Sequence, residues 1–153
     1  MKILGFRADP QAPRYAIVDA TNGIFSLLNA NSESKLSFPA PCTSDSEKLK
    51  WLHHEIERIF NEHADISRVV IKSNEYVGTE NKAKRFSAYE ESVVLLASSQ
   101  RNAEVCTKTY SSLPASSKTV KDQAALRVGQ TTMYWDAKMA DAVIAAWWGG
   151  NNP

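Results

Sequence analysis

The chain has 153 residues, of which 43% are hydrophobic and 23% are charged, as in ordinary globular domains. Its 18 basic and 17 acidic residues leave a net charge of +1, which excludes a global field that attracts nucleic acid or an anionic membrane, though not a local basic patch. The longest apolar run is too short to cross a bilayer, and charged residues interrupt the N-terminus before a signal-peptide core forms. We therefore expect one domain over residues 1–153, located in the cytoplasm and without a membrane partner.

Three short segments near the N-terminus have the alternation of β-strands. They cover residues 2–8, 15–20 and 24–28, and turn-forming Pro, Asp, Asn and Gly residues separate them. Such short links imply an antiparallel meander. Residues 29–42 are rich in Ser, Asn and Pro and are predicted to form a connecting loop. After this loop the apolar residues recur at helical spacing.

Helices and strands alternate in the rest of the chain. Ser44 and Glu47 form a capping-box pattern at the head of an amphipathic helix that reaches residue 63. Later patterns predict a strand over 66–73, a helix over 83–99, a strand over 103–110, a helix over 118–128 and a helix over 133–148. The first of these strands lacks strict alternation, which favours a central strand covered on both faces.

Local residues also predict where the last two helices begin and end. Ser116 or Ser117 is placed to cap the helix over 118–128, and Gly129 is placed to end it. The last helix should stop at Gly149 and Gly150. The resulting order, β-β-β-α-β-α-β-α-α, predicts an α/β fold in which three antiparallel strands and two α/β crossovers form a mixed sheet with helices on both faces.

This order is also that of RNase H-like domains, and three segments carry the likeness. "MKILGFRADP" resembles the first strand of the RuvC-like branch of that superfamily, "RVVIKSNEYVG" its fourth strand, and "AKMADAVIAAWW" its closing helix. The likeness covers almost the whole chain and is nearest to short, uncharacterised bacterial proteins with this fold. It implies a single RNase H-like domain.

The resemblance also implies where catalytic carboxylates would lie. Active members of the superfamily cut a phosphodiester with two divalent ions held by about four acids, because Mg²⁺ prefers hard oxygen ligands. The matching positions here hold Arg7, Lys72, Lys138 and Asp141. Three of the four are cations, which repel Mg²⁺ and are suited either to pairing with Asp141 or to holding a phosphate.

A displaced set of acids keeps a nuclease as an alternative. Asp9, Glu75, Asp136 and Asp141 would then bind Mg²⁺ or Mn²⁺ in an enzyme like a Holliday junction resolvase. Asp136 and Asp141 are five residues apart, about 140° around a helix, and do not easily share an ion. Asp9 also fits the Asp-Pro turn, where its side chain can bond the backbone.

Two further groups suggest binding surfaces. Lys82, Lys84 and Arg85 lie close to two aromatic residues, and such clusters contact phosphates and stack bases; the alternative is an ordinary helix start with exposed cations. Trp147 and Trp148 point about 100° apart on the last helix, so one of them suits either a homodimer interface or a cap on the core.

The leading hypothesis is therefore a binding module without conventional metal-dependent catalysis and without a cofactor. Its partner would be nucleic acid or a phosphate-bearing ligand, and the former active-site cleft would be lined by Arg7, Lys72, Lys138 and Asp141. The competing hypotheses are the Mg²⁺- or Mn²⁺-dependent nuclease for branched DNA and a structural homodimer built through the two tryptophans.

Overall fold

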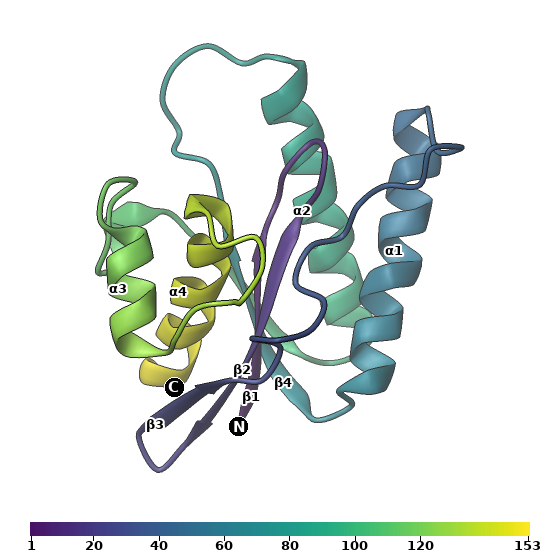
Figure 1. The fold of residues 1–153 in the computed structure, drawn as a ribbon. Coiled ribbons are helices and arrows are strands. Elements are labelled where there is room, and N and C mark those ends of the chain that lie inside the picture. The colour runs from purple at the N-terminus through teal and green to yellow at the C-terminus, as the bar shows by residue number, and fades with distance from the viewer.

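A five-stranded mixed sheet lies at the centre of the computed structural model, which describes all 153 residues (Figure 1). The strand order is β3-β2-β1-β4-β5, with β1 to β3 antiparallel and with β4 and β5 parallel to β1. The strands are β1 Lys2–Arg7, β2 Arg14–Thr21, β3 Ile24–Leu27, β4 Ile66–Lys72 and β5 Glu104–Lys108. The predicted meander and crossovers are confirmed.

Helices cover both faces of the sheet, as predicted. They are α1 Asp45–Glu62, α2 Lys82–Gln100, α3 Val120–Arg127 and α4 Ala137–Asn151, with a short 3-10 turn at Tyr110–Ser112. Figure 1 shows α1 and α2 on one side and α3 and α4 on the other. None of them combines the length and the apolar content that crossing a membrane requires.

The β-strand period of two divides the core between these faces. Leu4 and Phe6 of β1 point towards α1 and α2, whereas Ile3 joins the core beneath α3 and α4. In β4, Val69 and Val70 are buried on opposite faces, which confirms the prediction that this strand is covered twice. The start of α1 also follows its pattern, because the Ser44 hydroxyl accepts a hydrogen bond from Glu47 N at 3.2 Å and donates to the Glu47 carboxylate at 2.7 Å.

The predicted ends of α4 are wrong at both termini. The helix begins at Ala137 with Asp136 as its N-cap and runs through both glycines to Asn151. Gly149 and Gly150 are not stop signals but points of contact with the sheet. A Cβ on Gly149 would lie 2.8 Å from Val70 Cγ2, and one on Gly150 would lie 2.8 Å from Ala20 Cβ.

The predicted start of α3 is also wrong, although its end is confirmed. The N-cap is Thr119 rather than Ser116 or Ser117. Thr119 N donates to Ser116 O at 3.1 Å, and Ser116 N donates to Thr119 Oγ1 at 2.9 Å, so these residues form a turn before the helix. Gly129 follows the helix with a φ of +138°, a conformation that favours glycine.

A close contact between α4 and β1 positions the residues at the end of the sheet. Helix α4 lies directly on β1 at Gly5, where a Cβ would be only 1.9 Å from the carbonyl oxygen of Ala142. Only glycine allows this approach. It places Asp141, the neighbour of Ala142 on α4, beside the end of β1.

Candidate functional site

Two cations meet at the carboxyl ends of the central strands. Arg7 ends β1 and Lys72 ends β4, and they are register partners in the parallel ladder. Both are buried, with only 9% and 1% of their surfaces exposed. Ligand sites in α/β folds open at this edge of the sheet. Of the three cations at the positions expected for catalytic acids, Arg7 and Lys72 therefore lie side by side at the centre of this edge.

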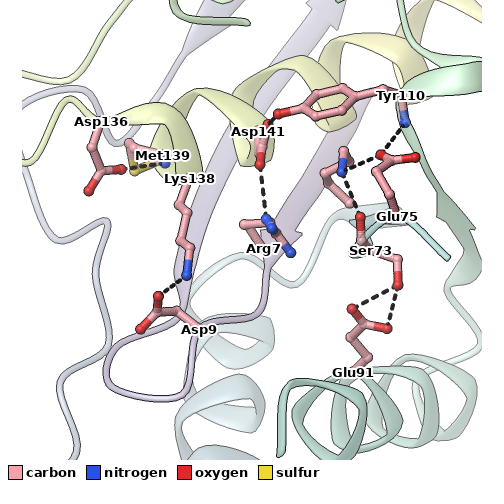
Figure 2. A network of polar contacts seen from close by, with 11 residues as sticks. Arg7, Asp9, Ser73, Glu75, Glu91, Tyr110, Asp136, Lys138, Met139 and Asp141 are labelled. Carbon is pink, nitrogen blue, oxygen red and sulfur yellow. Dashed lines mark hydrogen bonds and ion pairs between the residues drawn. The ribbon is translucent and has the colours of Figure 1, made fainter. Parts of the chain in front are cut away.

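Asp141 of α4 neutralises Arg7. Arg7 Nε donates to Asp141 Oδ2 at 2.9 Å, and the Tyr110 hydroxyl donates to Oδ1 at 2.5 Å (Figure 2). Burial raises the pKa of the Asp141 carboxyl, while the hydrogen bond from Tyr110 and the charges of Arg7 and Lys72 act in the opposite direction. Asp141 is only 3% exposed, so this ion pair is closed within the protein.

Lys72 has its own set of partners. Its ammonium group donates to Ser73 O at 2.6 Å and to Glu75 Oε1 at 3.1 Å, and it lies 3.9 Å from the centre of the Tyr110 ring. Glu75 Oε1 also accepts from Tyr110 N at 2.9 Å. Burial lowers the pKa of Lys72, although the nearby Asp141 charge opposes this shift. Tyr110 thus joins the two ion pairs into one network.

Lys138 belongs to a separate ion pair, with Asp9, and pairs with no other acid. Figure 2 shows Lys138 extending from α4 down to Asp9 in the loop after β1. Asp9 also accepts hydrogen bonds from Gln11 N at 2.8 Å and Ala12 N at 2.9 Å. The side chain of Asp9 therefore bonds the turn backbone, as predicted, and additionally binds a cation.

Asp136 likewise has a structural position. Its carboxylate accepts from Met139 N at 2.8 Å as the N-cap of α4 and pairs with Arg14 Nη2 at 2.8 Å. A carboxylate at a helix N-terminus is favoured by the partial positive charge of the unpaired N–H groups. Asp136 is thus committed to the start of the helix.

The residues do not fit a pair of divalent ions. The four acids of the alternative metal site, Asp9, Glu75, Asp136 and Asp141, are each bound to a different cation. Nowhere do three or more His, Cys, Asp or Glu side chains gather as potential metal ligands. At the centre of the sheet edge, where hard oxygen ligands would be required, the chain places a guanidinium and an ammonium group.

Glu90 is a buried acid that the sequence reasoning missed. It lies on α2 with 0% exposure, and neither carboxyl oxygen has a hydrogen-bond partner. Burial raises its pKa to about 9, and the charge of Asp9 adds to the shift. The acid is therefore neutral at pH 7. Its helical spacing from Phe86 and Val94, both of them buried, is the signal that identifies it as inward-facing.

Replacing Glu90 by glutamine should change how stability depends on pH. The folded protein keeps the Glu90 proton up to about pH 9, whereas an unfolded chain loses it near the ordinary pKa of 4.5. Stability therefore falls as pH rises through this window, by up to about 1.4 kcal/mol per pH unit. Since glutamine does not titrate, urea unfolding should show a stability gap in favour of Glu90→Gln that widens from about pH 5 to about pH 8.

The matched control for this pH experiment is Asp122→Asn, which removes an exposed acid from α3. Its stability should follow that of the wild type at each pH. Parallel profiles for wild type and Glu90→Gln would contradict the burial of an uncompensated carboxyl group.

The three cations of the predicted basic cluster, Lys82, Lys84 and Arg85, have different surroundings. Lys84 turns back to bond Val77 O at 2.9 Å and Thr79 O at 3.2 Å, which ties down the loop between β4 and α2. Arg85 pairs with Glu80 at 2.9 Å. Lys82 is exposed and has no ion pair, so it is the member of the cluster that is free for a ligand.

Trp147 and Trp148 are each half-buried and have partners within the chain. Trp147 lies 6.1 Å from Phe25 between ring centres, with the Arg127 guanidinium 4.7 Å from its own ring. The Lys108 ammonium group lies 4.2 Å from the Trp148 ring. The homodimer interface through these tryptophans stays a prediction.

The strand order, the helices on both faces and the closing α4 on β1 define an RNase H-like fold of the RuvC type. The chain is similar to Thermus thermophilus RuvC in complex with a Holliday junction substrate, with a TM-score of 0.77 and 13% sequence identity. It is similar to another structure of Thermus thermophilus RuvC, with a TM-score of 0.76 and 14% identity. Each of these two matches covers 97% of this chain and 92% of the RuvC chain. It is also similar to the yeast mitochondrial Holliday junction resolvase Ydc2, with a TM-score of 0.60, 11% identity and coverage of 97% of this chain and 77% of the other. No protein-family model and no curated protein sequence matches it.

Proposed function

We propose that this chain is a nucleic-acid-binding domain with an RNase H-like fold that acts without the divalent ions of a conventional nuclease. One observation carries the proposal. Arg7 and Lys72 occupy the carboxyl ends of the two central strands, and each is neutralised by an acid of the same chain.

Arg7 and Lys72 neutralise the carboxylates of Asp141 and Glu75, as a bound metal ion would otherwise do. Buried cations at 9% and 1% exposure are tolerated because Asp141 and Glu75 compensate them. Bringing Mg²⁺ next to Arg7 and Lys72 would add repulsion and would require both pairs to separate. The network therefore favours a structural role for Arg7, Lys72 and Asp141, which were expected to line the former active-site cleft.

Two observations favour nucleic acid as the partner. Thermus thermophilus RuvC, which shares the fold, has been solved in complex with a Holliday junction substrate. In addition, Lys82 presents an unpaired cation at the start of α2, and phosphate contacts from lysine dominate the affinity of proteins for nucleic acid. With Arg7 and Lys72 buried, exposed cations of this kind must supply those contacts.

Binding of a fluorescently labelled four-way junction in EDTA tests this proposal. Anisotropy should rise to saturation without divalent ions, and the affinity should fall as monovalent salt increases. Adding Mg²⁺ at constant ionic strength should not strengthen the complex. Absence of binding, or binding that requires Mg²⁺, would overturn the proposal.

A further inference from the structure

A hollow lies away from the buried network, between the N-terminal ends of α1 and α2. It has a volume of about 510 Å³, within the range of pockets that hold small ligands. We call it the α1–α2 groove and define it by its lining residues, Pro10, Asp45, Lys48, Lys82, Ala83, Arg85, Phe86 and Tyr89. Neither Arg7 nor Lys72 reaches it.

The groove is basic. It contains three cations and a single acid, Asp45. Lys48 and Lys82 have no ion pair, while Arg85 forms an ion pair with Glu80, which does not line the groove. Two long helices also begin here, so their unpaired N–H groups add partial positive charge. The groove is therefore complementary to an anion such as a phosphate.

The groove also holds an aromatic platform. Tyr89 is 40% exposed and makes an edge-to-face contact with Phe86 at 6.5 Å between ring centres. Phe86 is buried and packs on Phe38 at 6.0 Å, which ties the platform to the core under α1 and α2. Lys48 lies over the two phenylalanine rings, with its ammonium group 5.7 Å from the centre of Phe86 and 5.8 Å from that of Phe38. A flat ring on such a support is suited to stacking a base.

We propose that the α1–α2 groove binds single-stranded nucleic acid, with Lys48 and Lys82 contacting phosphates and Tyr89 stacking an unpaired base. The combination of free cations with an exposed ring favours a single strand over a duplex, because only unpaired bases offer their faces to a protein side chain. This inference rests on the proposed function and assigns it a surface.

Anisotropy titrations with a labelled oligothymidylate test the groove. Tyr89→Ala should weaken binding about tenfold or more, and Tyr89→Phe should restore it, because the ring and not the hydroxyl stacks. Lys82→Ala should reduce the slope of log affinity against log salt by about 0.7, the value for one phosphate contact on a single strand. Lys82 is exposed, so Lys82→Ala should unfold at the wild-type temperature. Tyr89→Ala should unfold at a slightly lower temperature because it loses the contact with Phe86, and thermal unfolding shows that each variant is folded in the binding buffer.

Matched controls lie elsewhere on the surface. Lys121→Ala removes an exposed lysine of α3, on the opposite face of the sheet, and Tyr134→Ala removes a tyrosine that is 50% exposed. Both controls should bind the oligonucleotide as the wild type does. If the wild type binds the oligonucleotide and the groove variants bind it equally well, the groove is not the binding site. The proposed function would be unaffected by that result.

Two other outcomes separate the possibilities further. If the wild type binds neither oligothymidylate nor junction DNA, the proposed function itself fails. If thymidine monophosphate competes as strongly as the oligonucleotide, the ligand of the groove is a free nucleotide, and the proposal of single-strand binding is wrong. Weaker competition by the mononucleotide is the result expected for a strand that uses more than one phosphate contact.

Discussion

Replacing Asp141 by asparagine should lower the free energy of unfolding by about 3 to 5 kcal/mol, the usual cost of removing one partner from a buried ion pair. The substitution keeps the size of the side chain but leaves the Arg7 charge without its carboxylate. Arg7 Nη1 is already buried without a hydrogen-bond partner, and Asp141 is the one acid that forms an ion pair with Arg7. Urea unfolding at pH 7 measures the loss.

Two companion variants make the Asp141 result specific. Asp65→Asn removes the acid of an exposed pair with Lys2 and should leave stability nearly unchanged. The double replacement Arg7→Met with Asp141→Leu removes both charges together and should recover much of the loss, since apolar residues often substitute for a buried pair. A loss for Asp141→Asn as small as that for Asp65→Asn would show that the pair is not buried.

Gly5→Ala should destabilise the protein by about 3 kcal/mol or more, or prevent folding altogether. The added methyl group would lie 1.9 Å from the backbone oxygen of Ala142 and 2.9 Å from Ala146 Cβ. A backbone atom cannot move aside as a side-chain tip can, so α4 would have to lift from β1. Thermal or urea unfolding of the purified variant measures the effect.

Gly149→Ala provides a graded comparison for this experiment. Its methyl group would meet only side-chain atoms, the nearest being Val70 Cγ2 at 2.8 Å. A smaller loss than for Gly5→Ala is expected because Val70 can adjust. Wild-type stability of Gly5→Ala would contradict the direct seating of α4 on the sheet.

The local elements were predictable because their signals are local. Turn residues between short alternating segments define the meander, and the Ser44 cap lies three residues from its partner. The wrong end of α4 is a case where tertiary packing overrides a local rule. Gly149 and Gly150 were expected to end α4, but they continue the helix, and their lack of a side chain lets it pack close against the sheet.

The sequence predicts that cations lie at the centre of the site, but it does not predict which acid pairs with which cation. Parallel neighbours bring Arg7 and Lys72 together, and pairing of these cations with Asp141 was one of two options that the charges allowed. Nothing in the sequence assigns Lys138 to Asp9 instead, because those residues are 129 positions apart and meet only when α4 docks. Tyr110 was missed for the same reason, since its hydroxyl lies 31 residues from its acceptor.

Titration of Mn²⁺ into the protein, followed by calorimetry, tests most directly whether ion pairs have replaced the metal centre. We expect no stoichiometric binding, because Asp9, Glu75 and Asp141 are each bound to a cation. Stoichiometric Mn²⁺ binding that disappears in Asp9→Asn and Glu75→Gln would contradict this, and would establish a metal site built from the displaced acids.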